Sequence, residues 1–206
     1  MPEQPTESRG VRSAKSFASL RPAHSTATAE LLGGVMTQAE SIFLSKTTLA
    51  AMATARQYGV PASITLAQAI CESGWGKSKL ATQANNYFGV KATHLTDPET
   101  YVEMPTEEFV HGVEKSELAD FERYISATES FKAHARLLSM AERYKPAMAV
   151  AADPDHFAIE LQQCGYSTSP SYAVELMMLV KEYDLQQYDV KPETAPAAPA
   201  GEKANA

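Results

Sequence analysis

Apolar residues recur with helical spacing through most of the segment from Thr37 to Val190. Thr37 and Glu40 have the spacing of a capping box, in which each residue's side chain bonds the other's backbone at a helix start. An apolar face then precedes Gly59, a residue type that often ends helices, and it consists of Leu49, Met52 and Ala53. We therefore predict two consecutive helices between Thr37 and Gly59.

The next helix is predicted to open at Pro61 and to stop at Gly74 and Gly76. Its core-facing stripe consists of Ile64, Ala67, Ile70 and Cys71, and its other side carries Thr65, Gln68 and Glu72. Glu72 thus lies in the last turn, where the negative end of the helix dipole disfavours an ionised carboxylate. We expect the pKa of Glu72 to be raised.

Short apolar and aromatic runs interrupted by polar residues follow, at 101–109 and 121–125, and they predict a small antiparallel hairpin. Helices are predicted to resume at Ser126, Asp153 and Ser169, which are typical helix-start residues. Their buried faces should consist of Phe131, Ala135 and Leu138, then Phe157, Leu161 and Cys164, then Tyr172, Leu176, Leu179, Val180 and Tyr183. The fold class is therefore mainly α, a helical domain with a small inserted β-hairpin lobe.

Composition narrows the organisation further. Residues 1–36 and 191–206 lack an apolar period and are predicted to be flexible tails around a domain at 37–190. A content of 44% hydrophobic and 21% charged residues suits a globular chain, and the net charge of −7 argues against nucleic-acid binding. No apolar run is long enough for a membrane span, and no secretory signal is visible near Met1. Cys71 and Cys164 fit buried apolar positions and no metal signature.

One reaction suits the position of Glu72. Hydrolysis of a glycosidic bond needs a carboxylic acid that is still protonated near neutral pH, and a residue at a helix end meets that need. The turn after it, Ser73 to Gly76, carries Trp75, whose indole could desolvate the acid or hold a sugar face. Spacing alone favours the simpler alternative, in which Glu72 is solvated and Trp75 belongs to the core.

Longer motifs change that balance. They read AQAICESGWG at 67–76, ANNYFGVK at 84–91 and TEEFVHG at 106–112, followed by FERYIS at 121–126, ESF at 129–131 and GYSTSP at 165–170 with Tyr172. Together they resemble the glucosaminidase family, the family-73 glycoside hydrolases that include the flagellar peptidoglycan hydrolase domain and many autolysins. The resemblance covers nearly all of 37–190 in the right order, and it implies a lysozyme-like α+β fold with the β-lobe flanking a cleft.

The resemblance also implies roles for single residues. Glu72 matches the catalytic acid, Glu108 the second acid on the β-lobe, and Tyr166 a cleft tyrosine that supports catalysis. The expected substrate-binding positions are Trp75, Asn86, Phe88 and Tyr172. The chain departs from the usual motifs at Cys71, at Phe109, which replaces a tyrosine, and at Ser169, which replaces an acidic residue.

Several of these positions have an ordinary alternative. Glu107 could take the place of Glu108, or both could lie on a solvated hairpin face. Asn86 would otherwise be a turn former, and Phe88 is expected to pack in the core. Tyr166 could cover a helix start, although an exposed hydroxyl would suit sugar contacts. The histidines, which include His94, His111, His134 and His156, share no spacing and are given no role.

The expected function is cleavage of the β-1,4 bond after N-acetylglucosamine in peptidoglycan glycan strands, with Glu72 as general acid, without metal or cofactor and without amidase activity. The alternatives are a muramidase or lytic transglycosylase, or a wall-binding module that is not a catalyst. Action is expected in the periplasm or cell wall. Since no signal is visible, delivery would depend on a secretion, flagellar or phage apparatus, or on lysis.

Overall fold

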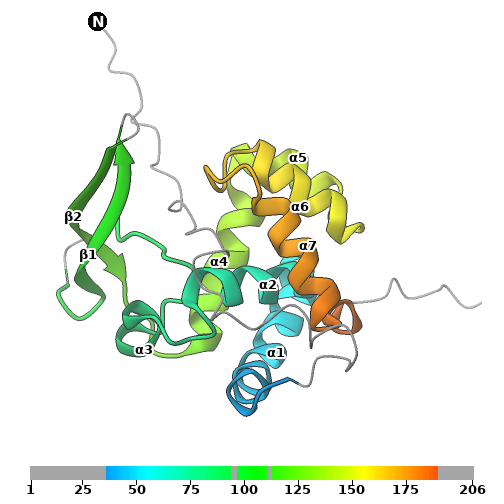
Figure 1. The fold of residues 1–206 in the computed structure, drawn as a ribbon, viewed down its shortest axis with the longest axis horizontal. Helices are drawn as coiled ribbons and strands as arrows, with labels where there is room; N and C mark the ends of the chain where they lie inside the picture. Colours follow the sequence, from blue (N-terminus) through cyan, green and yellow to red (C-terminus); the bar gives the residue numbers. More distant parts are fainter. Residues whose placement is uncertain (1–35, 94–96, 111–112, 190–206) are drawn as a thin grey trace, which may run out of the picture.

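The computed structural model describes residues 36–93, 97–110 and 113–189, with side chains except at 107–116. Helices form most of it, and one two-stranded hairpin stands beside them (Figure 1). The elements are α1 (Gln38–Tyr58), α2 (Ala62–Ser73), α3 (Lys79–Ala84), β1 (Tyr101–Val110), β2 (Val113–Glu122), α4 (Ala127–Met140), η2 (Glu142–Tyr144), α5 (Lys145–Ala149), α6 (Pro154–Gln163), α7 (Tyr172–Glu182) and η3 (Leu185–Tyr188). The predicted mainly α class with an inserted hairpin is confirmed.

Helix α1 is one continuous helix, so the prediction of two helices was wrong. The capping box of Thr37 and Glu40 is present, and Gly59 ends the helix with φ 74°. Nothing in between breaks the helix, because the hydroxyls of Thr47 and Thr48 donate to carbonyls one turn earlier instead of competing for the backbone in another conformation.

Helix α2 lies among the other helices and contacts α1, α6, α7 and η3. The predicted stripe of Ile64, Ala67 and Ile70 is buried as expected. The opposite side is also buried, since Thr65 and Gln68 have no exposed surface. The helix is therefore not amphipathic in the usual sense, with one face in the core and the other in solvent. A helix covered all round must satisfy its polar side chains inside the protein.

Strands β1 and β2 pair antiparallel from Tyr101 opposite Glu122 to Val110 opposite Val113. The first strand lies where the sequence predicts it, whereas the second was predicted at 121–125 and lies at 113–122. The residues of β2 include a charged stretch without an apolar alternation, so the sequence alone does not predict a strand there. They form a strand because they pair with β1. The segment around Lys91 bridges Phe121 and so ties the hairpin to the chain before it.

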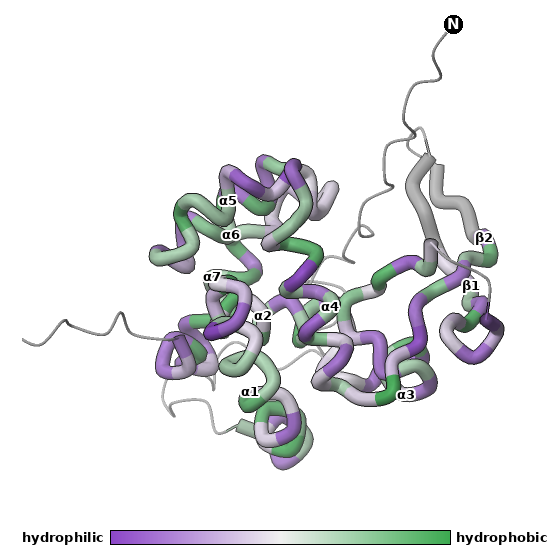
Figure 2. The backbone as a smooth tube through the Cα atoms, turned by 180° about the vertical axis from the view of Figure 1, so that it is seen from behind, coloured by the Kyte–Doolittle hydropathy of each residue, from purple (hydrophilic) through white to green (hydrophobic). Residues whose placement is uncertain are grey.

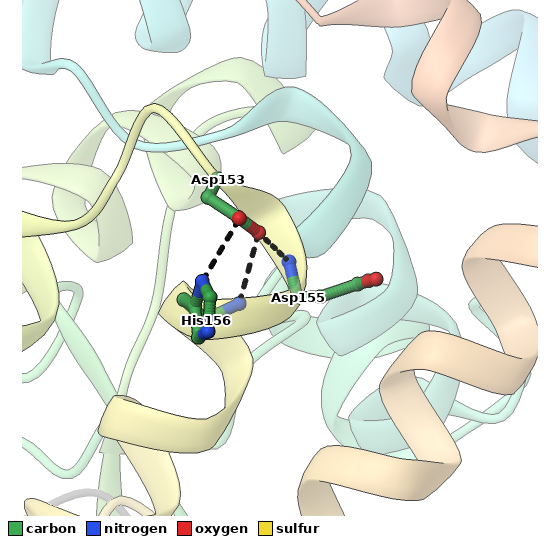
Figure 3. A network of polar contacts seen from close by, with 3 residues as sticks. All are labelled: Asp153, Asp155 and His156. Carbon is green, nitrogen blue, oxygen red and sulfur yellow. Dashed lines mark hydrogen bonds and ion pairs between the residues drawn. The ribbon is translucent and has the colours of Figure 1, made fainter.

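The later helices begin close to their predicted starts. Ser126 caps α4 by accepting a hydrogen bond from the amide of Glu129, and Asp153 caps α6 by accepting from the amides of Asp155 and His156 (Figure 3). These amide bonds and an ion pair with His156 lower the pKa of Asp153. Helix α7 begins at Tyr172 rather than at Ser169.

The core lies between the helices, and α1 and α4 each carry hydrophobic and hydrophilic residues (Figure 2). Of the buried faces predicted for α4, α6 and α7, Cys164 and Tyr183 are only partly buried and the other positions are fully buried. The apolar face predicted for α1 was wrong, because Leu49 is 76% exposed, Ala53 is exposed and Met52 is only partly buried. The helix instead packs a face that includes Phe43, Leu44, Ala50 and Ala51 against the core.

Cys71 and Cys164 are both free thiols. No helix in the described ranges is long and apolar enough to cross a membrane. The predicted tails fall outside the described residues, apart from Met36.

Candidate active site at the end of helix α2

The site is built around the last turn of α2. Gly74 follows the helix with φ 57°, a left-handed conformation that glycine adopts without strain, and its amide bonds the carbonyl of Ile70. The Ser73 hydroxyl accepts a hydrogen bond from the amide of Gly76 at 2.8 Å, which closes the turn. The sequence Ser-Gly-Trp-Gly thus ends the helix sharply and fixes Glu72 in its final turn.

Glu72 is half-buried as a residue, but its carboxyl oxygen Oε1 has almost no exposed surface and no hydrogen-bond partner among the described residues. Burial raises the pKa of Glu72 to about 8, and hydrogen bonding by Tyr172 acts in the opposite direction. The predicted direction is confirmed, although desolvation rather than the helix end is the largest cause. A carboxyl group of this kind is protonated at neutral pH and can donate a proton.

Three buried polar side chains form a chain of hydrogen bonds beside Glu72. The Gln68 side-chain amide donates to the Tyr172 hydroxyl at 2.9 Å, and the Gln68 side-chain oxygen lies 3.0 Å from Nε2 of His134. These side chains come from α2, α7 and α4 and have no exposed surface. Burial lowers the pKa of His134 to about 3, so its ring is neutral at neutral pH.

Tyr166 lies next to this chain but not on the surface. Its ring stacks on Tyr172 with centroids 5.5 Å apart and meets His134 edge-on, and only 1% of the residue is exposed. Its hydroxyl has no hydrogen-bond partner in the described part of the chain. Burial, and then the nearby Glu72, raise its pKa well above the ordinary value. The exposed hydroxyl considered for Tyr166 is therefore absent, although the structure does bring its ring to the site.

The aromatic residues predicted to bind substrate make packing contacts with other aromatic rings of the protein. Trp75 is partly buried and lies edge-on between Phe43 and Tyr183, with centroid distances of 5.5 and 4.7 Å. Phe88 has no exposed surface and stacks on His134 with centroids 3.9 Å apart. The expectation that Phe88 packs in the core is confirmed. Direct sugar contacts by Trp75, Phe88 and Tyr172 stay predictions.

Asn86 joins three backbone groups near the base of the hairpin. Its side-chain nitrogen donates to the carbonyls of Val90 and Glu122, both at 2.9 Å, and its oxygen accepts from the Val90 amide at 3.1 Å. Only 1% of Asn86 is exposed. The residue therefore fixes the segment before the hairpin to the end of β2, and substrate binding by Asn86 stays a prediction.

Glu108 lies in β1 with its backbone opposite Lys115, but its side chain, like that of Glu107, is outside the described part of the structure. The role of Glu108 as the second acid therefore stays a prediction. Within the described ranges, no group of three His, Cys, Asp or Glu side chains is arranged to hold a metal ion.

Sequence reasoning placed Gln68 on the side of α2 away from the core stripe and gave His134 no role. The structure places both in the polar chain beside Glu72. A signal for Gln68 was available, because it lies one helical turn before Glu72 and so shares its face. His134 lies at helical spacing with Phe131 and Leu138, which predicts burial but not its partner.

The comparisons with known proteins identify the family of this chain. The family model described as mannosyl-glycoprotein endo-beta-N-acetylglucosaminidase, of the Glucosaminidase family, matches residues 48–185. The chain belongs to this family.

Its curated relatives include an exo-glucosaminidase and a peptidoglycan hydrolase. The chain is 41% identical to exo-glucosaminidase LytG of Bacillus subtilis (strain 168) over 65% of its own length and 48% of LytG. It is 37% identical to peptidoglycan hydrolase FlgJ of Salmonella typhimurium over 68% of its own length and 45% of FlgJ. The chain thus matches about half the length of these curated relatives.

A solved structure supports the same fold. The catalytic domain of the autolysin Auto from Listeria monocytogenes superposes with a TM-score of 0.66 at 27% identity, covering 82% of this chain and all of that one. The family and the fold predicted from the motifs are therefore confirmed.

Proposed function

We propose that this protein is a peptidoglycan hydrolase that cleaves the β-1,4 bond after N-acetylglucosamine, as an endo-β-N-acetylglucosaminidase, with Glu72 as general acid. The observation that carries the proposal is the shielded carboxyl of Glu72, whose pKa burial raises to about 8, at the end of α2. Family membership supports the substrate class, because the relatives named above include a glucosaminidase and a peptidoglycan hydrolase.

In this mechanism Glu72 donates its proton to the glycosidic oxygen while the bond to the anomeric carbon breaks. The proton is available at neutral pH because burial disfavours the charged carboxylate. Once the proton has left, the new carboxylate is favoured by Tyr172, which opposes the rise in the pKa of Glu72. No metal or organic cofactor is needed for these steps.

The positive charge at the anomeric carbon needs a second group. We assign Glu108 to this role, as stabiliser or as base toward water, and the distance between the two carboxyls would decide between inversion and retention. The N-acetyl oxygen of the substrate is the alternative nucleophile. Tyr166 is assigned a supporting role because its buried ring lies beside Tyr172.

The test is digestion of purified peptidoglycan by the wild type and by Glu72→Gln, followed by reduction and mass spectrometry. Wild type should release fragments that end in reduced N-acetylglucosamine, and the variant should lose on the order of 10² to 10⁴-fold in rate, the usual contribution of a general acid. The control is Glu142→Gln, because Glu142 is an exposed residue in η2 and should leave the rate unchanged.

Other products would point elsewhere. Reduced muramic acid ends would indicate a muramidase, anhydro ends would indicate a lytic transglycosylase, and no cleavage would indicate a wall-binding module. Single residues or disaccharides released from strand ends would indicate an exo cut, as the name of LytG suggests for that relative. Full activity in Glu72→Gln would exclude Glu72 as the acid.

The proposed place of action is the cell wall or periplasm, where the substrate lies. A flagellar apparatus is one candidate for delivery because FlgJ is among the relatives, and a secretion or phage apparatus or lysis are the others. We further propose that residues 37–190 form the catalytic domain and that 1–36 and 191–206 are tails.

A further inference from the structure

We infer that Trp75 is a positioning residue and not a sugar-binding one: its indole holds a strained turn of the backbone, and this turn keeps Glu72 in place. This role rests on the proposed function of Glu72 as general acid, and it deepens that function by adding the residue that holds the acid. Three features of the structure support it, namely the backbone at Trp75, the hydrogen bonds of the turn and the ring contacts of the indole.

The backbone at Trp75 is left-handed, with φ 60°. Among the non-glycine residues that the structure describes, only Asn85 and Asp184 share a positive φ. Asparagine and aspartate adopt this conformation more readily than other side chains, whereas a bulky aromatic residue does so only under strain. Gly74 and Gly76 on either side are also left-handed, with φ 57° and 71°. Strain of this kind persists where the surrounding structure enforces it, and it clusters at functional sites.

Two hydrogen bonds tie this turn to the acid. The Trp75 amide donates to the carbonyl of Ile70 at 3.2 Å, which closes a ring of backbone that contains Glu72. The Gly76 amide donates to the Ser73 hydroxyl at 2.8 Å, so the residue directly after Glu72 is fixed as well. The place of Glu72 in the last turn of α2 therefore depends on the conformation that Trp75 holds.

The indole of Trp75 is anchored by side chains from two other helices. It contacts the ring of Phe43 in α1 and the ring of Tyr183 at the end of α7, with centroids 5.5 and 4.7 Å away. The Tyr183 hydroxyl donates to Oε1 of Glu40 at 3.1 Å, and Glu40 lies three residues before Phe43, on the same face of α1. These four side chains thus form one closed group at the start of α1.

The geometry of the ring contacts favours anchoring over sugar binding. The two neighbouring rings meet the indole at 76° and 68°, the edge-on arrangement that aromatic pairs prefer, and Trp75 is partly buried. Stacking on a sugar would need an indole that can turn toward the ligand. Such a movement would break both ring contacts and release the strained turn that holds Glu72.

The first test compares Trp75→Phe, Trp75→Ala and Trp75→Gly by kcat and KM on peptidoglycan and by urea unfolding. Trp75→Ala and Trp75→Gly should each lower kcat by about 10 to 100-fold, with KM within about 2-fold of wild type, because the acid is misplaced while substrate contacts are kept. Trp75→Phe keeps an aromatic ring and should restore most of the rate. Trp75→Gly should unfold at a higher urea concentration than Trp75→Ala, because glycine is left-handed without strain.

This pair of variants separates positioning from stability, since kcat should be equally low in two proteins that differ in stability. The control is Ile64→Val, which removes a buried methyl group at the other end of α2. It should lower the stability and leave kcat and KM unchanged.

The second test uses Trp75 as a probe, because it is the only tryptophan in the sequence. Soluble glycan fragments of peptidoglycan are titrated into Glu72→Gln, and calorimetry follows their binding. Neither the emission maximum of Trp75 nor its quenching by acrylamide should change when the fragments bind. Without any substrate, protection of the Gly76 amide from hydrogen exchange should fall in Trp75→Ala and Trp75→Gly and be kept in Trp75→Phe.

Three results would each overturn the positioning role. These are bound glycan that shields the indole from acrylamide, a Trp75→Ala or Trp75→Gly variant that raises KM without lowering kcat, and unchanged protection of Gly76 in these variants. If Trp75→Ala does not fold, the glycine and phenylalanine variants and the emission of Glu72→Gln decide. Absence of glycan cleavage by the wild type would instead reject the proposed function, while exchange at Gly76 would still show whether the indole holds the turn.

Discussion

The carboxyl of Glu72, the proposed general acid, lies where its charged form costs stability at neutral pH. In the unfolded chain this group has an ordinary pKa near 4.5, and in the folded protein burial raises it to about 8. Between these values the folded state holds a proton that the unfolded state releases. The stability associated with this proton is fully present below about pH 4.5 and is lost as the pH rises toward 8.

This linkage predicts the pH dependence of Glu72→Gln. Glutamine cannot ionise, so the unfolding free energy of the variant, relative to wild type, should rise by on the order of 2 to 4 kcal/mol between pH 5 and pH 8. The measurement is urea unfolding of both proteins at the two pH values. The exposed Glu142→Gln should differ from wild type by less than about 0.5 kcal/mol at both. A difference for Glu72→Gln that is the same at both pH values would contradict the raised pKa.

At the scale of elements, the hairpin depends on a residue outside it. Asn86 holds Val90 and Glu122 through three hydrogen bonds at a buried position. Nearby, the amide of Tyr124 donates to the carbonyl of Ala84 at 2.8 Å, which adds a backbone link at the same place. The catalytic role proposed for Glu108 therefore relies on a lobe whose base is fixed by an asparagine.

Asn86→Ala should destabilise the protein by about 2 to 4 kcal/mol, because it removes three hydrogen bonds that a buried side chain makes to the backbone. Gln83→Ala, an exposed position in α3, should cost less than about 0.5 kcal/mol. Urea unfolding gives both values, and hydrogen exchange of the Val90 amide should speed up only in Asn86→Ala. Unchanged stability with weakened peptidoglycan binding would instead support the substrate-binding role predicted for Asn86.

Elements with local signals could be predicted from the sequence. The side chains of Thr37, Ser126 and Asp153 accept hydrogen bonds from backbone amides three residues or fewer away. Each of them therefore marks the start of a helix by a local signal. Strand β2 was misplaced because its register comes from β1, and its own residues around Lys115 lack an apolar alternation. The sequence predicted two helices in place of α1 because the polar residues in the middle of this segment interrupt the apolar pattern, although they do not interrupt the helix.

The site depends on contacts between residues far apart in the sequence. The motif identified Glu72, but Gln68 meets His134 across 66 positions and Tyr172 across 104. Spacing could show that each of these residues lies on a particular helix face, not which faces meet. Tyr166 shows the same limit. Its position after Gly165 did not predict whether its side chain is buried or exposed, and the structure buries it.

At the scale of the whole molecule, the end of the described chain supports the start of the central helix. Pro61 precedes α2, and its side chain has no acceptor atom that could cap the helix. Instead, Oδ1 of Asp189 accepts a hydrogen bond from the amide of Ser63 at 2.8 Å, across 126 positions. An acceptor at the start of a helix satisfies an otherwise unpaired amide and opposes the positive end of the helix dipole. Asp189 thus contributes the cap that the local sequence lacks.

Two fragments test both this cap and the proposed domain limits. Residues 36–190, which begin at a methionine, should unfold within about 0.5 kcal/mol of the full chain and keep its activity, because they include every contact described above. Residues 36–188 lack Asp189 and should lose about 1 kcal/mol, as should Asp189→Ala in the full chain, since removal of a helix cap has this typical cost. Urea unfolding and peptidoglycan digestion provide the measurements. A large loss of stability in 36–190 would place part of the folded domain in the segments that it omits, and equal stability of the two fragments would remove the role of Asp189 in holding the start of α2.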